Sequence, residues 1–446
     1  MQLLARVNQR ARHPYCTHIL LGVAMNLALI LGCSSGVGRT DGDGGGAPGA
    51  NGGAPGANGG VPGANAGAPG TNGGAAGTSG TLASIGGAGS ASGGAAPSGG
   101  AGSSNGGQSS GGGSGSGVSG GPSTPAVHYV GRVDADNPAS VRFAWSGTGA
   151  VVRFRGDRAA VDLGGGQEYT VLVDGKLQPK LTATNGKNVL AQGLSADEHT
   201  IELYRRTEAS QGESEIRGFD FGTGQLLAPA PVTRRLEFVG DSITCGYGNE
   251  GANASCDFSA QTENHYLSYA AITARNLHAE LSTVAWSGKG VACNYGDDAS
   301  SCTDPLPTYY ARTLPNRVDS NWDFSLFQPD AVVVNLGTND LSTSIDPDKA
   351  TFEAAYRALL QRIRQAYPTA RILCTNGPLL NGTELTTVRG YITDVVTSMA
   401  DARITTFEIE PQDGSDGYGC QYHPSLAEHQ KVAAVVTAAL KTALGW

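Results

Sequence analysis

The sequence lacks three features that would each point to a particular class of protein. Basic residues are not in excess, since 30 Lys and Arg stand against 39 Asp and Glu and the formal net charge is −9. This balance gives no excess of positive charge of the kind that binds nucleic acid. The one early apolar stretch, residues 19–31, is too short and too interrupted to span a bilayer stably. No C-x-x-C spacing occurs, which argues against a zinc site. We expect neither a metal nor an organic cofactor.

The first 33 residues have the pattern of an export signal. A basic start that includes Arg6 and Arg12 precedes the apolar stretch, which ends in the string ILGC at Cys33. This ending resembles the bacterial lipoprotein signal, which implies cleavage before Cys33 and lipid attachment to it. The resemblance implies an exported protein that is anchored at the cell surface or outer membrane, with later release left open. An ordinary signal peptide with an incidental Cys is the competing interpretation.

Residues 34–124 contain almost no large apolar side chain. Gly, Ala, Ser, Asn and Pro dominate, and a seven-residue repeat places Pro48, Pro55, Pro62 and Pro69 in phase. Such a segment cannot bury enough surface to offset its ordering entropy. We expect a disordered, flexible tether.

Cysteine usage agrees with export. Cys16 lies in the signal and Cys33 at its end, so six of the eight cysteines remain, all in the second half of the chain: Cys245, Cys256, Cys293, Cys302, Cys374 and Cys420. An even number in an exported chain suggests disulfides, although sequence alone does not choose the pairing. Pairing of sequence neighbours (245 with 256, 293 with 302, 374 with 420) is our hypothesis.

Two regions with different patterns of apolar residues follow the tether. Residues 125–230 hold short runs that alternate with period two and are rich in β-branched and aromatic residues, which predicts a small β-sandwich. Residues 231–446 alternate strand and helix patterns, which predicts a three-layer α/β/α sandwich around a parallel sheet. We expect the strands of the first part at 141–145, 151–154, 169–173 and 200–204. In the second part we expect strands at 236–239, 281–285, 331–336 and 372–374, and helices at 266–277, 352–367 and 426–444.

Chemically reactive residue types lie at the carboxyl ends of these strands, where sites in such folds occur. Ser242, in the string GDSIT, follows the first strand, and a serine at a strand-to-helix turn can supply both a nucleophile and an oxyanion N–H donor. A helix cap is the alternative role. His423 stands just before the terminal helix, where Pro424 fits the first turn, and it can act as a general base.

Two further strings could complete such a site. The string WSGKG contains Gly288, whose N–H could approach a ligand closely. The string GTND contains Asn339, whose amide could donate a hydrogen bond to a developing oxyanion. Ordinary turns are the alternative at both places.

In this order, the four blocks resemble the SGNH or GDSL hydrolase superfamily over roughly residues 234–446. The resemblance implies that Ser242 is the nucleophile and His423 the general base. It also implies an oxyanion hole made by the N–H groups of Ser242 and Gly288 and the side chain of Asn339. The longer strings GDSITCGYG, TEN, SGKGV and NY, with a jelly-roll module ahead of the SGNH domain, are similar to carbohydrate esterase family two.

The family resemblance implies a monomeric serine esterase that removes O-acetyl groups from xylan, glucomannan or a similar polysaccharide, with membrane contact through the lipid anchor only. Trp286, Tyr295 and Tyr422 lie beside the motifs and could stack on sugar rings or simply pack. Three alternatives stay open: a deacetylase of the cell's own envelope or capsule, a lipase or thioesterase of the same superfamily, and a non-catalytic carbohydrate-binding surface protein.

One position departs from the superfamily pattern. Cys420 stands three residues before His423, where most SGNH enzymes have the Asp of a triad. The resemblance to some family-two members implies a Ser–His dyad steadied by a backbone carbonyl. Asp416 and Glu410 are the alternative groups that could orient the imidazole.

Overall fold

The structure is a computed structural model that describes residue 124 and residues 126–297, 301–342 and 346–446. The expected signal with its Cys33, and all of the tether up to residue 123, lie outside the described residues. None of the helices in the described part is long and apolar enough to cross a membrane.

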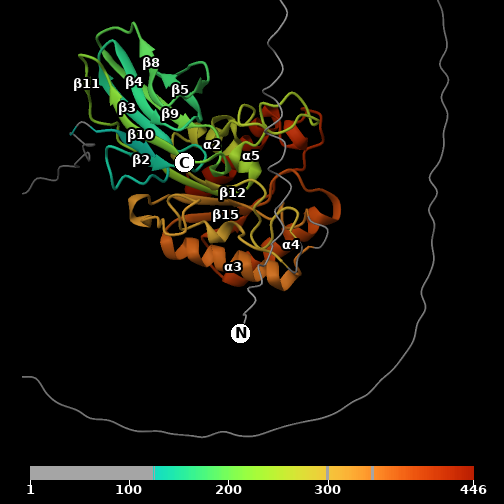
Figure 1. Cartoon of the computed structure of the whole chain (residues 1–446). Helices are drawn as coiled ribbons and strands as arrows, with labels where there is room; N and C mark the ends of the chain where they lie inside the picture. The colour runs from blue at the N-terminus through green and yellow to red at the C-terminus, as the bar shows by residue number, and fades with distance from the viewer. Residues whose placement is uncertain (1–123, 125, 298–300, 343–345) are drawn as a thin grey trace, which may run out of the picture. The chain divides into compact units, whose positions relative to one another are not determined.

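Residues 128–226 form an all-β module of two antiparallel sheets, drawn in cyan to green in Figure 1. Its strands are β1 (His128–Val130), β2 (Val141–Phe143), β3 (Gly149–Arg155), β4 (Arg158–Gly164), β5 (Glu168–Val173), β6 (Lys176–Leu177), β7 (Leu181–Thr182), β8 (Gly186–Gln192), β9 (Glu198–Arg205), β10 (Ser214–Asp220) and β11 (Gln225–Leu226). The larger sheet has the order β1-β3-β9-β5-β6, with β11 on β3 and β7 on β5, and the smaller has the order β2-β10-β4-β8.

The module folds as a sandwich because alternate residues of both sheets point into one core. Val152 and Phe154 of β3 are fully buried, and they share this core with Phe143 of β2 and Leu163 of β4 from the other sheet. Asp174 and Gly175 form a tight turn in this module. Both residues have positive φ, 50° and 71°, and they join the paired strands β5 and β6.

The rest of the chain builds a five-stranded parallel sheet with the order β13-β12-β14-β15-β16. In chain order its elements are β12 (Arg235–Gly240), α1 (Ser242–Cys245), α2 (Tyr269–Asn276), β13 (Glu280–Ala285), β14 (Ala331–Asn335), α3 (Lys349–Ala366), β15 (Arg371–Thr375), α4 (Gly382–Met399), β16 (Ile404–Thr406) and α5 (Leu426–Leu444).

Successive residues of each strand serve opposite faces of this sheet. Leu236 and Phe238 of β12 pack in one core with α2 and α5, whereas Val239 packs in a second core with α3 and α4. Figure 1 shows α3 and α4 on the face of the sheet opposite α2 and α5. The expected three-layer α/β/α sandwich is therefore confirmed.

The helix boundaries differ from expectation where a polar residue caps the helix. Asp348 accepts the Thr351 N–H, so α3 begins at Lys349 and not at 352. Ser268 caps α2 in the same way, so the preceding residues 265–267 form a separate 3-10 turn. We did not expect α4, although Leu385, Val388, Ile392 and Val395 give it a regular buried stripe.

The hypothesis for the disulfides is wrong for two of the three pairs. Cys293–Cys302 is confirmed, but Cys420 pairs with Cys256, while Cys245 and Cys374 are free and buried. Cys374 lies inside β15, in the core under α3 and α4. The backbone of Cys420 instead bonds to the carbonyl oxygen of Gly248, 2.9 Å away, which brings it to the loop that carries Cys256. Sequence neighbours are therefore not spatial neighbours here.

A buried ion pair joins the β-module to the parallel sheet. Arg132 lies just after β1, Glu237 lies in the middle of β12, and the Arg132 Nη2–Glu237 Oε2 distance is 3.0 Å with both side chains fully buried. The hydroxyls of Tyr310, Tyr367 and Ser282 also donate to this carboxylate, at 2.8, 3.1 and 3.2 Å. Because a buried charge is stable only with such partners, the pair requires the two parts of the chain to meet here.

Removing one member of this pair leaves the other buried and uncompensated. We expect Arg132→Ala to lower the free energy of unfolding by about 3–5 kcal/mol, measured by urea titration. Arg155→Ala, which removes an exposed pair with Glu198 on the same module, is the control and should change little. Equal, small effects of the two substitutions would contradict this account of the interface.

Candidate active site

Ser242 stands where β12 gives way to α1. Asp241 caps this short helix by accepting the Ile243 N–H at 3.0 Å, and Gly246 ends it in the left-handed conformation. The first residue of the helix is therefore Ser242, whose side chain is only 5% exposed at the carboxyl edge of the sheet. The helix-cap role considered for this string thus belongs to Asp241.

His423 reaches Ser242 from the far end of the chain. Its Nε2 lies 2.9 Å from the Ser242 Oγ, and its Nδ1 lies 3.2 Å from the backbone carbonyl oxygen of Gln421. Asp416, one of the two alternative orienting groups, forms an ion pair with Lys431 instead. The geometry is that of a serine and an imidazole steadied by a main-chain oxygen.

The backbone before His423 is unusual. Gln421 and Tyr422, neither of them glycine, both have positive φ, 51° and 62°. Such conformations persist only where their surroundings enforce them. Here the Cys256–Cys420 disulfide holds one side, while the Tyr247 hydroxyl donates to the Gln421 side chain at 2.6 Å. This turn directs the Gln421 carbonyl back toward the imidazole.

The imidazole of His423 is half-buried and packs against Tyr247, with ring centroids 4.2 Å apart and an interplanar angle of 35°. Loss of solvent around the ring lowers the pKa of His423 to about 4, and hydrogen bonds to the Gln421 and Cys420 backbones only partly oppose this shift. The imidazole is therefore neutral at neutral pH, the state in which Nε2 can accept a proton.

The loop after β13 carries Gly288. Gly288 has φ +77°, and a Cβ placed there would meet nothing within 4 Å, so this residue borders open space. Its carbonyl oxygen accepts the Tyr295 N–H at 2.8 Å. Asp340, which follows β14, holds the next part of the loop because its carboxylate accepts the backbone N–H groups of residues 291–293 at 2.7–2.9 Å.

Asn339 lies between the loop that carries Gly288 and the residue that precedes Ser242. Its Nδ2 donates to the Lys289 carbonyl oxygen at 2.9 Å and, more weakly, to the Asp241 carboxylate at 3.4 Å. Burial raises the pKa of Asp241 to about 7, against the opposing bond from the Ile243 N–H, and the charge of Asp340 adds to the increase. Asp241 therefore carries only part of a negative charge near neutral pH. The structure thus brings the strings of Ser242, Gly288, Asn339 and His423 to one place.

The three aromatic candidates have different surroundings. Tyr295 and Tyr422 are 68% and 65% exposed beside the loop of Gly288 and beside His423. Trp286 is partly buried and packs against Tyr309, with ring centroids 4.9 Å apart. The two tyrosines are free to contact a ligand, and Trp286 serves the packing of its loop at the least.

One residue that contacts the loop of Gly288 was not expected from the sequence. Glu208 comes from the β-module, in the loop after β9, and its carboxylate accepts the N–H of Ser287 at 2.6 Å. No local pattern marks this residue, because its partner lies 79 residues away in the other part of the chain. Its neighbour Glu263, by contrast, lies in the TEN string that contributed to the family resemblance.

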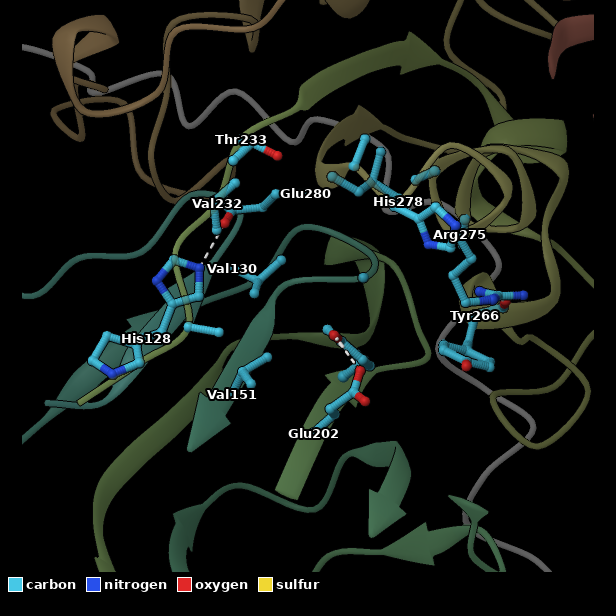
Figure 2. Close-up of a pocket in the computed structure, with 18 of the residues that line it drawn as sticks. His128, Val130, Val151, Glu202, Val232, Thr233, Tyr266, Arg275, His278 and Glu280 are labelled. Carbon is cyan, nitrogen blue, oxygen red and sulfur yellow. Dashed lines mark hydrogen bonds and ion pairs between the residues drawn. The ribbon is translucent and has the colours of Figure 1, made fainter. Parts of the chain in front are cut away.

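A separate cavity of about 290 Å³ lies between the β-module and α2, and it includes neither Ser242 nor His423 (Figure 2). Two pairs of its polar groups interact with each other. His128 lies 2.6 Å from the Glu280 carboxylate, and Glu202 accepts the Tyr204 hydroxyl at 2.8 Å. Figure 2 shows both interactions on the cavity wall.

Comparison with known protein families matches both parts of the chain. The family described as carbohydrate esterase 2 N-terminal matches residues 129–231. The GDSL-like lipase/acylhydrolase family matches residues 238–431. The first match covers the β-module and the second covers the parallel sheet with all four motif blocks.

Two curated proteins are similar to this chain over most of its length. The cellulase/esterase CelE of Acetivibrio thermocellus is 45% identical over 331 residues, which is 72% of this chain but only 40% of that protein. An acetylxylan esterase / glucomannan deacetylase of Cellvibrio japonicus is 28% identical over 73% of this chain and 90% of its own length.

Among solved structures, a family two carbohydrate esterase from Clostridium thermocellum in complex with cellohexaose has 43% sequence identity to this chain. The match covers 72% of this chain and 100% of that one, with a TM-score of 0.68. The chain belongs to carbohydrate esterase family two, a family of carboxylic ester hydrolases.

Proposed function

We propose that this protein removes O-acetyl groups from a polysaccharide by double displacement, with Ser242 as the nucleophile and His423 as the general base. The observation that carries the proposal is the 2.9 Å contact between the Ser242 Oγ and the Nε2 of a neutral imidazole. Xylan and glucomannan are the proposed substrates, since a relative that covers nearly the same length is named for both.

In the first half of the reaction, His423 Nε2 takes the proton of Ser242 Oγ as that oxygen attacks the acetyl carbonyl carbon. The Nδ1–H donates to the Gln421 carbonyl oxygen, which fixes the tautomer and steadies the imidazolium that forms. The tetrahedral intermediate collapses when His423 returns the proton to the sugar oxygen. The alcohol leaves, and the acetyl group stays on Ser242.

In the second half, His423 takes a proton from the water that attacks the acetyl carbonyl carbon. It returns this proton to Ser242 Oγ as the bond between that oxygen and the acetyl group breaks, so acetate is released and the free serine is restored. In both halves the oxyanion accepts hydrogen bonds from the Ser242 and Gly288 N–H groups and from Asn339. The weak 3.4 Å bond from Asn339 to Asp241 leaves that N–H available to a stronger acceptor. Burial of Asp241 helps as well, because a full negative charge there would oppose the oxyanion.

The surroundings of the site favour a polysaccharide over a lipid or a thioester. Tyr295 and Tyr422 present exposed rings next to the reacting groups, and such rings can stack on sugars. An acetyl group on a sugar hydroxyl therefore suits the site better than a long acyl chain.

We also propose that the enzyme is a lipoprotein, cleaved before Cys33 and held at the membrane by its acyl chains. Attachment would leave residues 34–124 as a spacer between the membrane and the esterase. In cells fed labelled palmitate, the label should appear in the wild-type protein and be absent from Cys33→Ser. Label that persists in Cys33→Ser would contradict the anchor.

Acetate release is the primary test of the activity. Residues 125–446 should release acetate from acetylated xylan and glucomannan, and Ser242→Ala should abolish the release because no nucleophile remains. Asn339→Ala should lower kcat roughly a hundredfold or more, through loss of one oxyanion donor.

Acetylated peptidoglycan is assayed beside the plant polymers, with Ser398→Ala, a surface serine of α4, as the matched control. Activity on peptidoglycan alone would keep the mechanism and replace the substrate with the cell's own envelope. Binding to the polymers without acetate release would contradict the esterase and leave a lectin.

The pH dependence follows from the environment of His423. Protonation of Nε2 removes the base, and because the pKa of His423 is lowered to about 4, kcat/KM should hold its value down to about pH 5 and fall below about pH 4. Acetate release measured from pH 3 to 8 checks this limb. An acid limb near the ordinary histidine pKa of about 6.5 would show that the imidazole is solvated in the working enzyme.

A further inference from the structure

The carboxylate of Glu208 links the β-module to the loop that carries Gly288. Its Oε2 accepts the Ser287 N–H at 2.6 Å, and Ser287 directly precedes Gly288. The side chain of Glu208 is 3% exposed, so water cannot substitute for this bond. A short, buried hydrogen bond of this kind is costly to lose, because its donor would be left without a partner.

The loop is also held at its other end. The carbonyl oxygen of Lys289, which follows Gly288, accepts a hydrogen bond from Asn339 Nδ2 at 2.9 Å. The two flanking bonds therefore fix the peptide that carries the Gly288 N–H and, through Lys289, the position of Asn339. Two of the three proposed oxyanion donors depend on this one loop.

Glu208 itself is held rigidly by its own module. The buried guanidinium of Arg205 donates to the carbonyl oxygens of Thr207 and Glu208, both at 2.8 Å. The Glu208 N–H donates to the Glu263 carboxyl at 3.2 Å, and the Ser210 hydroxyl donates to Glu208 Oε1 at 2.8 Å. The carboxylate thus has a fixed position from which to hold its partner.

Glu208, Cys245 and Glu263 also place three acidic or thiol groups within 4.8 Å of one another. Hydrogen bonds link these groups, since the Cys245 Sγ lies 3.5 Å from Glu208 Oε2 and donates to it. Burial first, and the charge of Glu208 second, raise the pKa of Glu263 and of Cys245 well above their usual values. Cys245 therefore keeps its thiol proton at neutral pH.

We propose that Glu208 is a positioning residue for the esterase reaction, through which the β-module holds the loop of Gly288 in the geometry that the oxyanion needs. The inference rests on the proposed function, because it assigns that loop to oxyanion binding. In this account the β-module supports the active site by holding the loop of Gly288, and it does not act as a separate binding unit.

The test compares substitutions of Glu208 in the intact pair of modules. Glu208→Ala removes the acceptor, so kcat for acetate release should fall roughly tenfold to a hundredfold while KM stays within about twofold. Glu208→Gln keeps an acceptor oxygen of the same reach and should recover most of kcat. Glu208→Asp keeps the carboxyl group but shortens its reach, so kcat should also fall in this variant. It takes the place of Glu208→Ala in the test if Glu208→Ala fails to fold.

Glu213→Ala is the matched control. Glu213 belongs to the same module and forms two bonds to Arg317 of the other part of the chain, both at 2.7 Å, without touching the loop of Gly288. Its kcat should equal that of the wild type. An equal loss of kcat in Glu213→Ala would show that Glu208 acts through general module docking, which would overturn the proposal.

Hydrogen exchange separates this proposal from the proposed function. The amides of residues 286–290 should exchange faster in Glu208→Ala than in the wild type and Glu213→Ala, whether or not the enzyme releases acetate. If the wild-type protein releases no acetate, the proposed function is contradicted but the role of Glu208 in holding the loop is not. Unchanged exchange in the loop, or an unchanged kcat, in folded Glu208→Ala would overturn the role of Glu208.

Discussion

The parallel register of the central sheet is the constraint on which the site depends. Gly240, the last residue of β12, pairs with Ala285 of β13 on one side and with Asn335 of β14 on the other. All three strands therefore end at one level, and the residues that follow them leave the same edge of the sheet. Ser242, Gly288 and Asn339 follow these ends by only two to four residues, so they converge without any long excursion of the chain. The hydrogen-bond ladder thus does most of the positioning before any side chain contributes.

The fourth block needs a different device, because His423 does not follow a strand of this sheet directly. Two residues with positive φ, a disulfide to Cys256 and a packed tyrosine turn its imidazole toward Ser242. Cys420, which stands where most superfamily members have Asp, is one partner of this disulfide.

Much of the fold could be predicted from the sequence, since strands and helices are local patterns. The runs 236–239 and 426–444 lie within β12 and α5, and the side chains of Ser242 and His423 are in contact. Pairing of cysteines could not be predicted, because it depends on which loops meet in space. The role of Glu208 was hidden for the same reason: its partner lies in another part of the chain, and a lone Glu after a strand carries no signal.

The central claim is that the reaction passes through an acetyl group on Ser242. Rapid acid quenching of the enzyme during turnover on acetylated xylan, followed by digestion and mass spectrometry, tests it most directly. The account predicts an acetyl group on the peptide that contains Ser242 in the wild type, and none in Ser242→Ala. Turnover without any acetylated Ser242, or acetate release that survives Ser242→Ala, would contradict it.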